Sequence, residues 1–278
     1  MKSPFPVPTS IVGLAGLLVA LAAPALAQNP APVLPAASPA EQGQAIAKKI
    51  AERSSGYGDM VGEVEMTLRN KGGDEATRRF TLKLLERPAA DEGDYSLVVF
   101  QSPADVKGTA LLSHVKINDD DDQWLYLPAL KRVKRISSQS RTGSFVGSEF
   151  SYEDLSGNEV AEHEWKLDGE GPCRDGKTCY KLEARPKDPA SGYQKRVLFV
   201  EKDGSRIQKV VFYDRRGDKL KALKYDDYKK VGGRFDRAHR WHMKNYQTGK
   251  ETLLTFRSLV VNKGLTESDF NKAQLKGG

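Results

Sequence analysis

Residues 119–155 read DDDDQWLYLPALKRVKRISSQSRTGSFVGSEFSYEDL, and this stretch combines two strand patterns with one long loop. The first strand is aromatic and ends at a proline, with the order Trp124-Leu125-Tyr126-Leu127-Pro128. The second strand is basic through Lys131, Arg132, Lys134 and Arg135. A Ser- and Gly-rich loop follows, and its large side chains are Phe145, Phe150 and Tyr152. Loops of about twenty residues are uncommon in compact domains and are often functional. Since large aromatic side chains favour burial, we expect this loop to cover an apolar surface as a lid.

Outside this stretch, the sequence predicts one early helix and then mostly strands. Ser38-Pro39-Ala40-Glu41 combines a capping box with proline at the first helical position, and the helix should end by Gly56. Beyond it, apolar and polar residues alternate with a period of two, which is typical of strands. The first such apolar residues are Val64, Met66, Leu68, Phe80, Leu82 and Leu84. Further strands are expected at 94–101, 109–117, 123–127, 131–136, 158–167, 179–185, 193–201, 205–213, 219–228, 237–246 and 250–261.

Turn sequences such as Asp203-Gly204 and Thr248-Gly249 separate these strands, and no helical segments intervene. Consecutive hairpins of this kind form an antiparallel meander. A sheet of ten or more strands must curl, and the interior is then too wide for its own side chains to fill. We therefore expect a mainly β fold: an antiparallel, incomplete (half-open) β-barrel with an N-terminal helix and a lid loop. A packed β-sandwich is the alternative.

The N-terminus predicts export. Lys2 precedes an apolar run at 11–23, and Ala25-Leu26-Ala27 ends it, as in a secretory signal peptide. The run is shorter than the ~20 residues that a membrane anchor needs. We expect residues 1–27 to be a signal peptide cleaved near Ala27-Gln28, residues 28–38 to be a flexible Pro/Ala-rich leader, and residues 39–278 to be a single β domain outside the cytoplasm.

Cysteine usage and charge agree with an exported protein. Cys173 and Cys179 flank an Asp-Gly turn, so they should face each other across a hairpin tip and form a disulfide. Removal of residues 1–27, which contain one Lys and no acid, changes the net charge from +7 to +6. Outside the cytoplasm this charge favours anionic lipid or acidic protein partners over nucleic acid.

The order of motifs between Gly108 and Leu155 resembles the signature block of the outer-membrane lipoprotein-sorting protein family, which is LolA-like and periplasmic. The matching motifs are Trp124-Leu125-Tyr126-Leu127-Pro128, the basic run Lys131–Arg135 and Gly143-Ser144-Phe145-Val146-Gly147-Ser148. The resemblance extends from the first helix to Phe270. It implies an incomplete barrel with a helical lid and an apolar cavity that holds acyl chains. Because related members are often linked to RND-type export pumps, delivery of lipids or of hydrophobic small molecules is implied as readily as lipoprotein transfer.

The inward-facing residues of the early strands are the candidates for such a cavity. They are Met66, Leu68, Phe80, Leu82, Leu97, Val99, Leu111, Trp124 and Tyr126. Each could also be an ordinary core residue, and alternation alone does not reveal which face of a strand is inside. The loop at 137–157 and the helix at 39–53 are the candidate moving parts.

The charged and histidine-containing segments leave alternatives open. The basic residues Lys131, Arg132, Lys134 and Arg135 could contact a head group or a partner protein, or could protect an edge strand from aggregation. Asp119–Asp122 could bind calcium but fits a solvated turn better, so no metal site is expected. His239 and His242 face opposite sides of a strand, and common catalytic motifs are missing.

We therefore expect a carrier or chaperone that binds lipid acyl chains or lipoproteins, for transfer to the outer membrane or to or from an export pump. We expect it to be neither an enzyme nor a cofactor-binding protein. The alternatives are an envelope interaction or sensor module and a soluble accessory subunit of an RND-type transporter.

Overall fold

The computed structural model describes residues 37–87, 93–116, 119–156, 160–203 and 206–276. The expected signal peptide at 1–27 and most of the expected leader at 28–38 lie outside these residues. Among the described elements, α1 (Pro39–Ser54) is the α-helix, and no helix has the length and apolar character to cross a bilayer. The capping box at its start is confirmed: Ser38 Oγ accepts from Glu41 N at 3.2 Å, and Glu41 accepts from Ser38 N at 2.7 Å.

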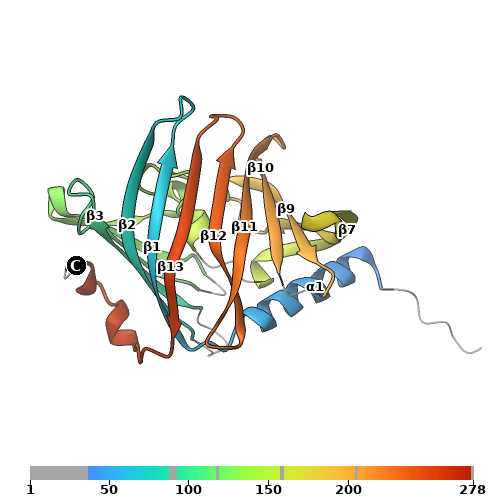
Figure 1. Cartoon of the computed structure of the whole chain (residues 1–278), viewed down its shortest axis with the longest axis horizontal. Coiled ribbons are helices and arrows are strands. Elements are labelled where there is room, and N and C mark those ends of the chain that lie inside the picture. Colours follow the sequence, from blue (N-terminus) through green and yellow to red (C-terminus); the bar gives the residue numbers. More distant parts are fainter. Residues whose placement is uncertain (1–36, 88–92, 117–118, 157–159, 204–205, 277–278) are drawn as a thin grey trace, which may run out of the picture. The chain divides into compact units, whose positions relative to one another are not determined.

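Thirteen antiparallel strands form one sheet in the described part of the chain (Figure 1). Their bounds are β1 (Asp59–Arg69), β2 (Glu75–Leu85), β3 (Tyr95–Ser102), β4 (Ala110–His114), β5 (Asp122–Leu127), β6 (Arg132–Ile136), β7 (His163–Pro172), β8 (Thr178–Pro186), β9 (Tyr193–Glu201), β10 (Ile207–Asp214), β11 (Lys219–Val231), β12 (Phe235–Asn245) and β13 (Glu251–Val261). The order across the sheet is β6-β5-β4-β3-β2-β1-β13-β12-β11-β10-β9-β8-β7. The first and last strands are therefore neighbours at its centre, and β6 and β7 are its edges.

The sheet curls without closing, which confirms the half-open barrel expected from the sequence. The expected strand at 158–167 is displaced: residues 160–162 form a 3-10 turn, and β7 runs from His163 to Pro172. β7 extends this far because it pairs with β8 as far as the disulfide-closed turn at 173–179.

The helix α1 packs against the edge strand β7 and also reaches β12. It lies very close to β7, because a Cβ on Gly43 would stand 2.6 Å from the backbone nitrogen of Lys166. Glycine is therefore required at this close approach. Ala47, Ile46 and Ile50 point from the helix into the main apolar core. The helix thus covers the edge of β7 and part of the concave side of the sheet.

The apolar core has two main parts, one on each face of the sheet. The larger part lies on the concave face and includes Met66, Phe80, Phe100, Leu198 and Met243. The second part lies on the opposite face of β3–β5, under the C-terminal segment that follows β13. Figure 1 shows this segment, in red, running from the end of β13 toward β3. Its Phe270 and Leu275 are 0% exposed.

Candidate ligand-binding site

The loop that follows β6, which the structure describes over residues 137–156, packs on the concave face of the sheet. Phe145 and Phe150 belong to the concave core, and Tyr152 packs against it. The Phe145 ring centroid lies 5.7 Å from that of Phe100 on β3 and 5.8 Å from that of Tyr152. The three aromatic residues singled out from the sequence are therefore brought together over the strands.

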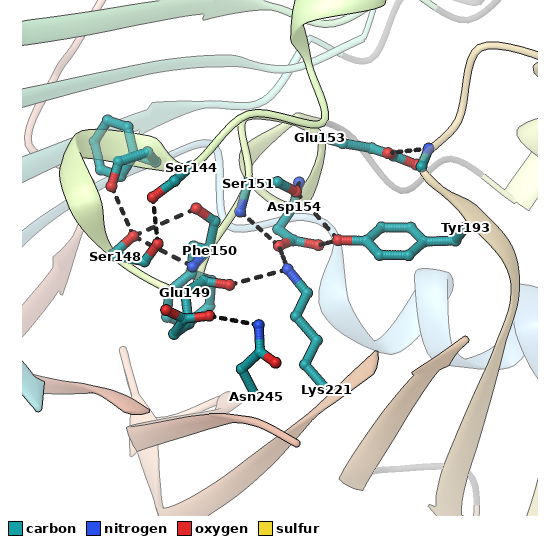
Figure 2. Close-up of polar contacts among 12 residues, drawn as sticks. Ser144, Ser148, Glu149, Phe150, Ser151, Glu153, Asp154, Tyr193, Lys221 and Asn245 are labelled. Atoms are coloured by element: carbon teal, nitrogen blue, oxygen red, sulfur yellow. Dashed lines mark hydrogen bonds and ion pairs between the residues drawn. The ribbon is translucent and has the colours of Figure 1, made fainter. Parts of the chain in front are cut away.

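Serine and glycine residues shape the tip of this loop. Val146 and Gly147 have φ of +46° and +73°, and the second of these is a left-handed position that glycine adopts without strain. Ser148 Oγ donates to the Phe145 carbonyl at 2.7 Å and accepts from Phe150 N at 3.2 Å (Figure 2). Short hydroxyl side chains stabilise turns in this way by bonding nearby backbone groups. The Ser- and Gly-rich composition thus fixes a tight turn that places both phenylalanines inward.

A buried ion pair joins the loop to β11. Lys221 Nζ lies 2.5 Å from Asp154 Oδ2, and both side chains are 5% exposed (Figure 2). Lys221 Nζ also donates to the Glu149 carbonyl at 2.9 Å. Asp154 accepts further bonds from Tyr193 Oη at 2.8 Å and from Ser151 N at 2.8 Å. Removing one partner of such a buried pair costs about 3–5 kcal/mol, since the other charge is left without compensation.

A second pair of buried charges lies beside the first. Arg196 Nη2 on β9 is 3.3 Å from Glu153 Oε1, and both side chains are 10% exposed. Glu153 also accepts from Ser191 Oγ at 2.5 Å and from Gly192 N at 2.9 Å. Further polar contacts to the sheet come from Glu149, whose Oε2 accepts from Asn245 at 2.7 Å. The loop is therefore held to β9, β11 and β12 mainly by charged and polar groups.

The electrostatics of this cluster keep Asp154 ionised. Burial raises the pKa of the Asp154 carboxyl, but the charges of Lys221 and Arg196 outweigh burial, and the pKa lies below its ordinary value. Burial and the neighbouring Asp154 raise the pKa of Tyr193 well above its ordinary value, so this phenol stays neutral and can donate to the carboxylate.

A cavity of about 170 Å³ lies between the loop and strands β7–β12. Its lining is mostly aromatic and aliphatic, with Asp154, Arg196 and His163 as the polar members. The apolar lining residues are Phe150, Trp165, Ala184, Leu198, Ile207, Val210, Phe212, Leu223, Tyr225 and Trp241. Ligand pockets usually measure about 300–1,000 Å³, so this cavity is small in the present arrangement of the loop.

The nine residues predicted to line a cavity do not line this one. Met66, Phe80 and Leu111 are buried in the concave core, and Leu68 and Leu82 pack against it, but they lie in the half of the sheet that the loop fills. The assignment of the other four to the same face was wrong, since they lie on the convex face under the C-terminal segment: Leu97, Val99, Trp124 and Tyr126. The strand register gives the reason, because Leu82 pairs with Val98 and not with Leu97.

The remaining candidates lie apart from the cavity. Lys131, Arg132, Lys134 and Arg135 are exposed on or beside the edge strand β6. The disulfide between Cys173 and Cys179 is confirmed, with a Cα–Cα distance of 5.1 Å. Asp122 pairs with Lys116 at 3.0 Å, as in a charge-balanced turn. Within the described ranges, no three His, Cys, Asp or Glu side chains converge to hold a metal ion.

Sequence reasoning missed the cavity residues on β8–β12 and the buried cations that face the loop. The alternation of β10 and β11 placed apolar residues such as Val210 and Leu223 on one face, and this was the available signal for the cavity. No local signal marks Lys221 as buried, because the sequence Lys219-Leu220-Lys221 resembles an ordinary solvent-facing strand.

The sequence and structure of this chain are similar to those of known proteins. A structure from Vibrio parahaemolyticus, assigned as an outer membrane lipoprotein-sorting protein domain, is 45% identical, with a TM-score of 0.81 over 85% of this chain and 99% of that one. The chain belongs to the outer-membrane lipoprotein-sorting protein family. A family model described as an uncharacterized protein matches residues 92–277.

Two other solved structures are similar to this chain and share its fold. A DUF1329 family protein from Desulfovibrio piger is 30% identical, with a TM-score of 0.80 over 86% of this chain and 100% of that one. A LolA superfamily protein from Nitrosomonas europaea is 21% identical, with a TM-score of 0.66 over 84% of this chain and 98% of that one, and it shows the shared fold. No curated protein matches the sequence.

Proposed function

We propose that this member of the lipoprotein-sorting family is a periplasmic carrier that holds acyl chains, free or attached to lipoproteins, beneath the loop at 137–156. The observation that carries the proposal is the apolar cavity of about 170 Å³ roofed by a loop that buried charges hold in place. The relative from Vibrio parahaemolyticus, assigned as a lipoprotein-sorting domain, supports the same class of function.

Because the cavity is small, binding of a long acyl chain has to involve movement of the loop. Each methylene of an acyl chain gains about 0.8 kcal/mol on leaving water, which favours a long chain over a short one. The cavity is smaller than ordinary ligand pockets, so a long chain requires the loop to move away from β8–β12. In this structure Phe150 lines the cavity and Asp154 is paired with Lys221. A bound acyl chain must displace these contacts. When the contacts form again, they assist release of the chain.

The other parts of the proposal rest on features of the amino-acid sequence. Residues 1–27 act as a cleaved signal peptide, residues 28–38 as a leader, and residues 39–278 as one lipid-binding domain in the periplasm. The disulfide between Cys173 and Cys179 supports an oxidising compartment. The protein acts by binding and transfer, and not as an enzyme. Lys131, Arg132, Lys134 and Arg135 contact head groups or a partner, and the helix at 39–53 moves together with the loop.

A soluble accessory subunit of an RND-type transporter is the second candidate function. The edge strand β6 favours it, because one side of this strand pairs with β5 and no described strand pairs with its other side. An extended segment of a partner could add to such an edge. This function requires a membrane protein partner and does not require cargo in the cavity.

Uptake of a fluorescent fatty acid tests the carrier proposal. Ala184 lines the cavity and is 1% exposed, so Ala184→Leu places three additional carbon atoms in the cavity. We expect at least a fivefold loss of affinity for the probe. The matched control is Ala76→Leu, the same change at an exposed position of β2. We expect this variant to bind as the wild type does.

Native mass spectrometry of protein isolated from the periplasm without detergent distinguishes the two candidates. Bound lipid in the wild type, reduced in Ala184→Leu, supports the carrier. Wild-type protein that takes up no probe and carries no lipid would exclude the carrier, and the accessory-subunit function would then stand.

A further inference from the structure

The tip of the hairpin between β5 and β6 presents an apolar side chain to solvent. Leu130 is 67% exposed, more than any other large hydrophobic residue in the described ranges. The tip is a tight 3-10 turn, Pro128–Leu130, closed by a bond from Lys131 N to the Pro128 carbonyl at 3.0 Å. Lys131 then adopts a left-handed conformation with φ of +48°. A closed turn that contains proline limits the freedom of the tip, so the exposure of Leu130 is built into the backbone.

Three cations without acidic partners follow this leucine in the sequence. Lys131, Arg132 and Lys134 are exposed, and none forms an ion pair with a described residue. Arg135, by contrast, is paired with Asp122. Elsewhere many basic side chains are neutralised, as for Lys244 with Glu251 at 2.9 Å. The hairpin therefore combines three uncompensated positive charges with one exposed leucine within five residues, Leu130 to Lys134.

Protection of the edge strand explains only part of this pattern. Charged side chains on β6 would discourage pairing with another chain, as edge strands require. An exposed leucine at the tip has the opposite effect, since exposed apolar surface promotes association. An acidic protein surface would balance the charges but would give the leucine no apolar environment of its own. A bilayer with anionic lipids accommodates both the charges and the leucine, because the leucine enters the acyl boundary while the basic groups stay among the head groups.

We propose that the β5–β6 hairpin docks the protein on an anionic lipid bilayer, with Leu130 inserted and Lys131, Arg132 and Lys134 bound to head groups. Docking rests on the head-group contact of the proposed function and deepens it, because it specifies an anionic bilayer and an inserted leucine and requires no cargo. The docked tip precedes β6 at one end of the strand, and the loop begins at the other end, immediately after Ile136. The same strand that contacts the bilayer thus leads directly into the segment that roofs the cavity.

Co-sedimentation with vesicles tests the docking. The protein is used without residues 1–27, so that the apolar N-terminal run does not partition by itself. We expect binding to phosphatidylcholine vesicles that contain phosphatidylglycerol, weak binding to pure phosphatidylcholine, and weaker binding at higher salt. Leu130→Ser should lower the partition coefficient about tenfold. Each basic residue near an anionic surface contributes about fivefold, so changing Lys131, Arg132 and Lys134 together to Gln should lower it at least tenfold.

Matched variants separate docking from general charge and hydrophobicity. Val260→Ser removes another exposed apolar residue, 47% exposed on β13. Changing Lys71, Lys177 and Lys250 together to Gln removes three exposed charges at other turns. Both controls should bind as the wild type does, and all variants should keep the wild-type melting temperature. The proposal is overturned if phosphatidylglycerol does not increase binding of the wild type, or if the hairpin variants and the control variants lose binding equally. It is also overturned if Leu130→Ser binds as the wild type does, since an acidic protein partner would then fit the hairpin better. These outcomes are independent of fatty-acid uptake.

Discussion

Strands β1–β6 and strands β7–β13 form the two halves of one sheet, yet different kinds of contact cover them. In the first half, β3–β5 are buried on both faces, by Phe145 on the concave side and by Phe270 and Leu275 on the convex side. In the second half, the loop meets the sheet through Lys221 and Arg196, and a cavity remains beneath it. Apolar packing in the first half is dense and continuous, whereas the contact in the second half consists of buried charged groups beside unfilled space. The proposed movement of the loop is therefore expected to separate it from the second half.

The largest expected effect follows from breaking the contact between loop and sheet. Lys221→Met leaves Asp154 buried without its partner, and we expect the free energy of loop closure to fall by about 3–5 kcal/mol. Hydrogen exchange of the amides at 141–156 should accelerate strongly, while the amides of β4 keep their protection. Lys224→Met, on an exposed lysine of the same strand, is the control. Equal acceleration in β4 and in the loop would show that the halves do not differ.

A slightly smaller effect, on the free energy of unfolding, is expected when the apolar packing of the first half is weakened. Phe270 is fully buried against β3–β5, and Phe270→Ala should lower the free energy of unfolding by about 3 kcal/mol. Urea denaturation measures this change. Tyr246→Ala, at an aromatic residue that is 42% exposed, should stay within about 0.5 kcal/mol of the wild type. A small effect of Phe270→Ala would mean that the C-terminal segment does not hold the convex face.

The same substitution of a buried alanine by valine, made once in each half, compares the packing of the two halves directly. Ala110 on β4 is 0% exposed and is packed within the convex core, so Ala110→Val should destabilise by about 1–3 kcal/mol. Ala184 on β8 borders the cavity, so Ala184→Val should cost less than about 1 kcal/mol. Thermal or urea unfolding of the two variants gives the difference. Equal costs would show that the cavity offers no space to a side chain.

Acidification should weaken the loop contact by the smallest amount. The pKa of Asp154 is lower in the folded protein than in the unfolded chain, where it lies near 4. The ion pair therefore stabilises the closed loop at pH above that value, and this contribution disappears as the pH falls through the lower, folded pKa. Fluorescence of Trp165 and Trp241, which line the cavity, should report the change below pH 4. Asp154→Asn should remove this transition, and an unchanged profile would assign it to another group.

Much of the fold could be predicted because its signals are local. The capping box at Ser38–Glu41, the alternation of β1 and the disulfide-closed turn at 173–179 each depend on residues close together in the sequence. The aromatic residues of the loop were also marked by their surroundings, since Phe145 and Phe150 stand among serines and glycines.

The site could not be predicted in the same way, because distant residues decide it. Leu97 and Val98 are both apolar and both buried, and only pairing with Leu82 shows that Val98 faces the concave side. Lys221 is buried because Asp154 lies opposite it, sixty-seven positions earlier in the chain. Alternation identifies two faces of a strand but cannot say which one a later segment will cover.

The pairing of β1 with β13 has a consequence for how the chain is made. Arg69 pairs with Glu251 and Met60 pairs with Val261, so the two halves cannot be joined before β13 has been synthesised. Until then β1 exposes an unpaired edge, and long-range pairing of this kind slows folding and leaves time for aggregation. A chain that ends before residue 251 would therefore contain two partial sheets that no strand pairing joins.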